Sequence, residues 1–281
     1  MLSYRHGFHA GNHADVLKQV VFVFLLRHLV QKDKPFWCID THAGAALYDL
    51  TKGYAAKNAE YETGISRLWT HKDLPGPVAD YVQQVRALNP DGALRLYPGS
   101  PQLAMQMLRK KDRLRLFELH STESQALQEY FRDAGHRVVA QAGDGFVGLQ
   151  SLLPPPSRRA LVLIDPSYED KDDYKRVLVA LREGLRRFAT GVYAVWYPQV
   201  QRAESRRFPE LLKGVQDKDW LHVTLTVKAP VAGGLGLHGS GMFILNPPWT
   251  LPAALRPVMP YLIKVLGQDD RAGFGLEFKL A

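Results

Sequence analysis

The chain has 281 residues, 46% of them hydrophobic and 23% charged, a balance typical of folded soluble proteins and not of disordered or fibrous ones. Its formal net charge of +8 attracts polyanions, so RNA or DNA is an admissible partner, although charge alone identifies neither. The single cysteine, Cys38, excludes an internal disulfide and a multi-cysteine zinc site, and we expect a reducing compartment, the cytoplasm. The early apolar run at 20–26 is too short to cross a membrane, and no secretion-signal layout precedes it, so we expect no membrane role.

Hydrophobic periodicity predicts strands that alternate with helices along most of the chain. A helix is expected over residues 13–31 and a short buried strand over 36–40, followed by a turn at 41–45. Further strands are expected at 113–119, 137–142, 160–165, 191–197, 221–228 and 241–245, with helices such as 122–133 and 172–188 between them. This alternation predicts an α/β fold with a mostly parallel, doubly wound sheet.

The stretch from residue 49 to 94 interrupts the alternation. It contains no convincing strand and two helical segments. The second segment places five apolar residues on one face: Val78, Tyr81, Val82, Val85 and Leu88. We therefore expect a main domain formed by residues 1–48 and 95–281, with an inserted helical subdomain at 49–94.

The most informative residues about chemistry follow the apolar strand at 160–164: Asp165, Pro166, Ser167 and Tyr168. Ligands of open α/β sheets bind at the carboxyl ends of the strands. An adenine amine is a poor nucleophile because its lone pair is delocalised into the ring. We expect the Asp165 carboxylate and the Pro166 carbonyl each to accept one N–H, which directs the lone pair toward a sulfonium methyl, while Tyr168 stacks on the base. The alternative is an ordinary turn, since Asp, Pro and Ser all favour turns.

A second candidate turn, residues 246–249, reads Asn-Pro-Pro-Trp. Its sequence is closer than that of residues 165–168 to the amine-methyltransferase pattern of Asp or Asn, Pro, Pro and an aromatic residue. Asp165 follows the fourth strand counted from the turn near Asp40, which predicts a position beside the switch point of the sheet. We therefore prefer Asp165 as the catalytic residue and expect Asn246 to be structural.

Small and acidic residues at the ends of successive strands predict a cofactor site for S-adenosylmethionine. The turn at 40–45 lets the backbone approach a ligand closely, and its only glycine, Gly44, does not make a dinucleotide fingerprint, which disfavours a nicotinamide enzyme. Glu118 ends the next strand, where an acidic residue binds ribose hydroxyls. The residues that form this ordered set are His42, Glu118, Asp144 with Gly145, and Asp165.

Ser100, followed by Pro101, is predicted to be a helix N-cap with proline at the first helical position. A capped helix N-terminus also faces anions readily, so the carboxylate of the cofactor is expected nearby.

The first residues and one later segment are rich in polar and basic side chains. His6, His9 and His13 suggest zinc, but the spacing matches no usual pattern and no metal is expected. The alternative is a polar surface that touches the substrate, formed by Tyr4, Arg5, His6, Asn12 and Lys18. The basic residues between 109 and 115 are expected to form a solvated face, with phosphate contact as the second interpretation.

Four stretches together resemble the RlmJ family of 23S rRNA adenine-N6 methyltransferases: Tyr4–Lys18 (YRHGFHAGNHADVLK), Asp40–Gly44, Tyr97–Pro101 and Asp165–Glu169. The resemblance implies a Rossmann-like class I methyltransferase domain with a helical insertion, S-adenosylmethionine as donor, and an adenine of naked or partly assembled 23S rRNA as acceptor. It implies Asp165 as the catalytic proton acceptor and Tyr4 as a substrate contact. The cofactor contacts that it implies are His42, Ser100, Glu118, Asp144, Gly145 and Asp165.

Two positions depart from the family pattern. Gln19 stands where the family has a cofactor-contacting histidine, and Ser167 replaces the second proline of the catalytic motif. Glutamine still donates and accepts hydrogen bonds, so we expect changed affinity or rate and not lost activity. The competing functions are adenine-N6 methylation of DNA and an inactive RNA-binding protein that keeps the fold. No obligate protein partner is evident, and we expect a monomer.

Overall fold

The computed structural model describes residues 6–215, 219–231 and 236–280, so the predicted substrate contacts Tyr4 and Arg5 lie outside the described residues. The strands are β1 (Trp37–Asp40), β2 (Leu47–Asp49), β3 (Leu96–Pro98), β4 (Arg113–Glu118), β5 (Val138–Ala142), β6 (Ala160–Ile164), β7 (Val192–Gln199), β8 (Trp220–Thr226), β9 (Gly239–Leu245) and β10 (Gly273–Lys279). The α-helices are α1 (His13–Gln31), α2 (Gly53–Asn58), α3 (Ile65–Trp69), α4 (Gly76–Ala87), α5 (Ser100–Met107), α6 (Ser121–Tyr130), α7 (Gly145–Leu152), α8 (Asp172–Arg187), α9 (Ala203–Lys213) and α10 (Leu251–Leu266). Short 3₁₀ helices are η1 (His6–Phe8), η2 (Glu60–Thr63) and η3 (Gly135–Arg137).

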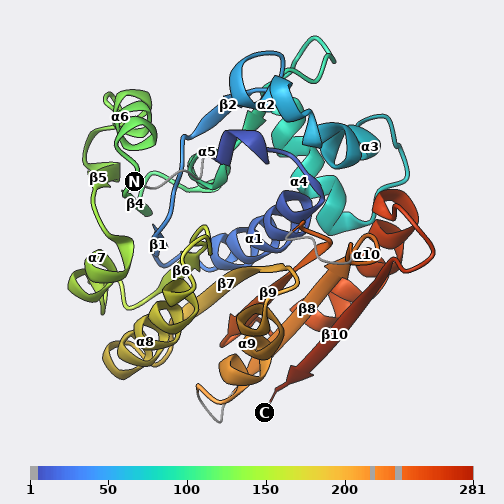
Figure 1. Ribbon diagram of the computed structural model, residues 1–281. Helices are drawn as coiled ribbons and strands as arrows, with labels where there is room; N and C mark the ends of the chain where they lie inside the picture. Colours follow the sequence, from blue (N-terminus) through green and yellow to red (C-terminus); the bar gives the residue numbers. More distant parts are fainter. Residues whose placement is uncertain (1–5, 216–218, 232–235, 281) are drawn as a thin grey trace.

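Eight strands form the central sheet in the order β10-β8-β9-β7-β6-β1-β4-β5 (Figure 1). The strands β5, β4, β1, β6 and β7 are joined by parallel pairing, whereas β9 pairs antiparallel with both β7 and β8. β8 therefore runs in the direction of β7, and only β9 and β10 are reversed. The sequence prediction of a mostly parallel α/β sheet is confirmed.

The chain changes direction across the sheet between β1 and β6. From β1 it first adds β4 and β5 on one side, and then returns to add β6 and β7 on the other. Asp40, the last residue of β1, is in register with Leu116 of β4 and Leu163 of β6. The loops after these three strands therefore leave the same edge of the sheet, at the switch point where α/β sheets bind ligands.

Helices cover both faces of the sheet, as the alternating side chains of β6 require. Leu161 and Leu163 of β6 pack in one core with α1, α4, α5 and α10, whereas Val162 and Ile164 pack in a second core with α7, α8 and α9. The five residues of β6 are all buried. A strand that is buried on both faces reads as a continuous apolar run, which is why it was recognisable from sequence.

The helix α1 is buried along most of its length and not only on one face. Asn12 caps its start, because the side-chain oxygen accepts from the backbone N–H groups of Ala14 and Asp15, each at 2.9 Å. Four of its polar residues are also buried: His13, Asp15, Lys18 and Gln19. Buried charges need partners, so the position of this helix determines where those partners must lie.

The predicted insertion is helical and is bounded by an antiparallel pair, β2 with β3. Its apolar residues, among them Ile65, Val78 and Val82, share the core of α1. Tyr81 of α4 also hydrogen-bonds Tyr97 of β3 through their hydroxyls at 3.0 Å. The segment thus packs as part of the main body, and the boundaries at 49 and 94 stay a prediction.

Three other features refine the sequence predictions. The turn at Asn246 follows the reversed strand β9 and so lies at the opposite edge of the sheet from Asp165; its amide donates to the carbonyls of Ala189 and Gly191, as a structural role requires. The guanidinium of Arg109 is not simply solvated, because it pairs with Asp112 and donates to carbonyls after α1. The sheet also gains β10, an exposed edge strand that was not predicted from the sequence.

In the part of the chain that the structure describes, no helix is long and apolar enough to cross a membrane.

Leu26→Ala tests whether α1 is the centre of the larger core. Leu26 is fully buried, and truncation leaves a cavity that the packed surroundings fill only in part, so we expect a loss of about 2–5 kcal/mol in the free energy of unfolding. Denaturant unfolding measures it. Val179→Ala on α8, where the side chain is 58% exposed, should change that free energy by less than about 0.5 kcal/mol. Equal effects would contradict this arrangement.

Candidate active site

Two cavities meet at Asp165. The larger one, of about 800 Å³, is lined by residues from the N-terminal motif, the insertion and the turns after β6 and β7. The smaller one, of about 140 Å³, is lined by the turns after β1, β4 and β6. His6, Lys18, Asp165 and Ser167 line both cavities. The predicted catalytic carboxylate therefore lies where a ligand in one cavity would reach a ligand in the other.

The smaller cavity is lined by most of the predicted cofactor residues. His42 and Gly44 come from the turn after β1, Ser100 from α5, Glu118 from the end of β4, and Asp165 from the turn after β6. Gly44 has φ +60°, a conformation that favours glycine, and a side chain there would meet the Tyr48 hydroxyl. Glycine at position 44 therefore lets this turn lie directly against Tyr48, which also lines the cavity.

Glu118 holds the turn after β1 in place. Its Oε2 accepts from the backbone N–H of Gly44 and its Oε1 from that of His120, each at 2.7 Å. Burial raises the pKa of Glu118, although the two backbone hydrogen bonds favour the ionised form. Because each carboxylate oxygen accepts about two hydrogen bonds, both oxygens keep capacity for the hydroxyls of a ribose.

Ser100 has a different role from the predicted one. The N-cap of α5 is Gly99, and Ser100 is the first residue within the helix. Its hydroxyl donates to Oδ2 of Asp40 at 2.6 Å, so the helix start is tied to the end of β1. The prediction of a serine N-cap was wrong because the sequence did not show this buried acceptor.

Asp144 and Gly145 lie beside the smaller cavity and do not line it. Asp144 caps α7, accepting from the backbone N–H of Phe146 at 2.9 Å, and pairs with Arg176, which lines the cavity. Gly145 packs on the turn after β1, where a side chain would collide with the Thr41 carbonyl. Burial lowers the pKa of the neighbouring His42 to about 3, so its imidazole is neutral at pH 7.

Gln19 is fully buried on α1 and lines neither cavity. Both polar atoms of its amide are without a hydrogen-bond partner among the described residues. The contact with the cofactor that the family pattern implies for Gln19 therefore stays a prediction.

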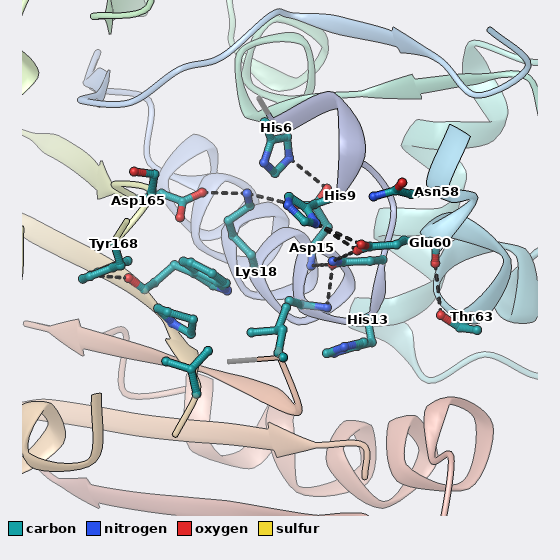
Figure 2. Close-up of a pocket in the computed structure, with 18 of the residues that line it drawn as sticks. His6, His9, His13, Asp15, Lys18, Asn58, Glu60, Thr63, Asp165 and Tyr168 are labelled. Atoms are coloured by element: carbon teal, nitrogen blue, oxygen red, sulfur yellow. Dashed lines mark hydrogen bonds and ion pairs between the residues drawn. The ribbon is translucent and has the colours of Figure 1, made fainter. Parts of the chain in front are cut away.

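A buried ion network supports Asp165 from α1. The Lys18 ammonium lies 2.8 Å from Oδ1 of Asp15 and 2.7 Å from Oδ2 of Asp165, and it is almost fully enclosed. Although burial disfavours the charge, the two carboxylates raise the pKa of Lys18. The other oxygen of Asp15 lies 3.1 Å from Nε2 of His6 (Figure 2). Two of the predicted substrate residues, His6 and Lys18, are thus brought close to the predicted catalytic carboxylate.

Tyr168 lines the larger cavity but is mostly buried in this conformation, and its stacking on a base stays a prediction. Only 2% of the residue is exposed, and its hydroxyl donates to the Trp196 carbonyl at 2.7 Å. Its ring packs against those of Tyr174 and Phe208. Tyr168 has φ +54°, so this anchoring holds a strained turn. Trp196 of β7 lines the larger cavity together with Tyr168.

The insertion contributes Glu60 to the larger cavity, which the sequence analysis did not foresee. Its carboxylate binds Nδ1 of His9 at 3.0 Å and the Asn12 amide at 2.9 Å. His6 and His9 thus pair with different acids, and among the described residues no three metal-binding side chains are grouped together. The pairing of Glu60 with His9 could not be predicted from sequence, since the two residues are 51 positions apart. The pairing of Asp15 with Lys18 could have been predicted, because residues three positions apart on a helix can form an ion pair.

The reversed strand β9 between β7 and β8, the switch point beside Asp40, and the ligand cavity after β1 and β4 are the features of a class I methyltransferase. A family model described as Ribosomal RNA large subunit methyltransferase D, RlmJ, matches residues 33–278. The chain belongs to this family.

Individual relatives agree with the family. A Haemophilus influenzae protein named Ribosomal RNA large subunit methyltransferase J is 43% identical over 279 residues, 99% of each chain. An Escherichia coli K12 protein of the same name is 46% identical over 262 residues, 93% of each chain. A crystal structure of a Legionella pneumophila protein is 35% identical, with a TM-score of 0.88 over 96% of this chain and 98% of that one.

Asp40 predicts a pH dependence of stability. Burial raises its pKa from 3.8 to about 6, against the hydrogen bonds from Ser100 and His42. The folded protein therefore keeps a proton that the unfolded chain releases at lower pH, and the free energy of unfolding falls as pH rises from about 4 to 6, by up to about 3 kcal/mol. Asp40→Asn removes this proton, so the wild-type protein should lose more stability than the variant between pH 4.5 and 6.5. Parallel unfolding profiles over this range would contradict the assignment.

Proposed function

We propose that this chain transfers a methyl group from S-adenosylmethionine to the N6 amine of an adenine in 23S rRNA. The observation that carries the proposal is the position of Asp165 between two cavities, a smaller one lined by most of the predicted cofactor residues and a larger one. His6 and Lys18 at this junction are proposed to contact the substrate, as are Tyr4 and Arg5 just before them in the chain.

The residues of the smaller cavity fit S-adenosylmethionine. Glu118 offers acceptors to the ribose hydroxyls at the strand end where they are expected. Acidic side chains, Asp165 and Asp173 among them, also line this cavity and suit a cationic sulfonium. When bound, the cofactor supplies an electrophilic methyl group. His42, Ser100 and Gly44 would complete its surroundings, with Asp144 and Gly145 behind them.

Asp165 is proposed to orient and deprotonate the amine. Lys18 binds Oδ2, which leaves Oδ1 to accept an N–H of the adenine, while the Pro166 carbonyl accepts the other. These two acceptors hold the lone pair toward the donor. The nitrogen loses one proton as it gains the methyl group, and Asp165 is placed to take that proton. The second proline of the family motif is not needed for this arrangement, since Ser167 leaves the Pro166 carbonyl in place.

RNA is the proposed substrate in preference to DNA. An unpaired or loosely paired base in rRNA is extruded at lower cost than a base in a B-form duplex. Lys228 and Arg202 add positive charge to the larger cavity, which suits a phosphate backbone. We propose a monomeric enzyme of the cytoplasm, a compartment that its substrate and its single buried cysteine, Cys38, suit.

Asp165→Asn tests the catalytic role. The amide keeps the size of the side chain but cannot take a proton, so we expect kcat to fall by about 100-fold or more. Binding of S-adenosylhomocysteine should change little. The measurement is methyl transfer to 23S rRNA prepared from cells that lack this activity, with mass spectrometry of the modified fragment.

The matched control is Asp172→Asn at the exposed start of α8, which should keep wild-type activity. Duplex DNA should be a far poorer substrate than rRNA. Methylation of DNA in preference to rRNA would support the first alternative. An unmodified protein that binds rRNA but neither binds the donor nor transfers a methyl group would support an inactive RNA-binding protein.

Glu118→Gln tests the cofactor site. The substitution removes the charge that strengthens hydrogen bonds from the ribose, so we expect S-adenosylhomocysteine to bind about tenfold more weakly. Isothermal titration calorimetry measures the change. Glu129→Gln on α6, whose side chain is 65% exposed, is the control and should leave the affinity unaltered. Unchanged affinity in both variants would exclude Glu118 from the site.

A further inference from the structure

The larger cavity extends well beyond Asp165. Figure 2 shows Asp165 and Tyr168 on one side of it and His13, Glu60 and Thr63 on the other. Its volume of about 800 Å³ is near the top of the usual range for small-molecule pockets, about 300–1,000 Å³. A target adenine must lie at the Asp165 side, because its N6 amine has to reach that carboxylate. The side around His13 and Glu60 is therefore left for a second group.

His13 has the surroundings of a ligand-binding residue and not those of a surface histidine. It is the first residue of α1, is only 6% exposed, and lines the cavity. Burial lowers the pKa of His13 to about 4, so the ring is neutral at pH 7. Its Nδ1 has no hydrogen-bond partner among the residues that the structure describes. A buried polar atom without a partner costs about 1–3 kcal/mol, and a bound ligand would relieve that cost.

Glu60 presents a fixed negative charge next to His13. His9 and Asn12 hold its carboxylate from two directions, at 3.0 and 2.9 Å. Although burial opposes ionisation, these partners lower the pKa of Glu60. A carboxylate accepts about four hydrogen bonds, so it keeps capacity for donors on a ligand. Repulsion disfavours a phosphate at this point, whereas an amino group on a base is favoured.

We propose that the His13 side of this cavity binds the base of the nucleotide adjacent to the target adenine in the RNA chain. The inference rests on the proposed function and adds a second subsite to it. His13 and Glu60 bond the edge of the second base, and the Lys228 ammonium, which also lines the cavity, contacts the backbone phosphate. Because Glu60 requires hydrogen-bond donors, guanine and cytosine fit better than uracil.

The test compares ligands that differ only in the second base, with S-adenosylhomocysteine present. The series contains adenosine monophosphate, dinucleotides with the second base on either side of adenosine, and a dinucleotide whose second ribose lacks a base. On one side of adenosine, guanine or cytosine should tighten binding at least about tenfold over the abasic ligand, as one or two hydrogen bonds would. Equal affinities for the abasic and complete dinucleotides would overturn the subsite. A gain with uracil as large as that with guanine would contradict the role of Glu60.

His13→Ala should reduce the affinity for the preferred dinucleotide to that for the abasic ligand and leave the affinity for adenosine monophosphate within about twofold. His28→Ala, on the same helix but away from both cavities, should change neither. An equal loss for all ligands would place His13 in the adenine site and overturn the proposal. If His13→Ala does not fold, the ligand series with the wild-type protein still tests whether the second base is bound. Methylation of rRNA by the wild-type protein tests the proposed function separately.

Discussion

The buried ammonium of Lys18 ties the N-terminal motif to the turn after β6. It lies within 2.8 Å of Asp15 on its own helix and 2.7 Å of Asp165 after β6. Removing one partner from a buried ion pair costs about 3–5 kcal/mol, because the remaining charge is left uncompensated. The packing of α1 against the sheet and the orientation of the Asp165 carboxylate therefore depend on each other. This coupling explains why α1 carries two charges in its buried part.

The same network separates the two ligand spaces. Lys18, Asp165 and His6 form the wall between the smaller cavity, which is made by strand ends, and the larger cavity, which is made by the N-terminal motif and the insertion. Glu60 fastens the insertion to this motif through His9. The strand ends thus line the smaller cavity, and the insertion lines part of the larger one. In the proposed function, a methyl group needs to move only across the junction at Asp165.

The sheet and the acids at its edge could be predicted from sequence because both follow from local pattern. Apolar runs that end in Asp165 or Glu118 identify strand ends, and parallel strands bring such ends to one edge. The roles of Ser100 and Tyr168 could not be predicted in this way, since they depend on Asp40 and Trp196, which lie far away in the chain. The motif indicates that an aromatic residue follows the turn, but it does not show that the ring of Tyr168 packs against those of Tyr174 and Phe208.

The most direct test is a crystal structure with S-adenosylhomocysteine and adenosine monophosphate bound together. The cofactor sulfur should face Asp165 from the cavity beside Glu118, and the adenine N6 should face the same carboxylate from the cavity beside Trp196, within hydrogen-bond distance of Asp165 and the Pro166 carbonyl. Both ligands in one cavity, or an adenine amine directed away from Asp165, would contradict methyl transfer across this junction.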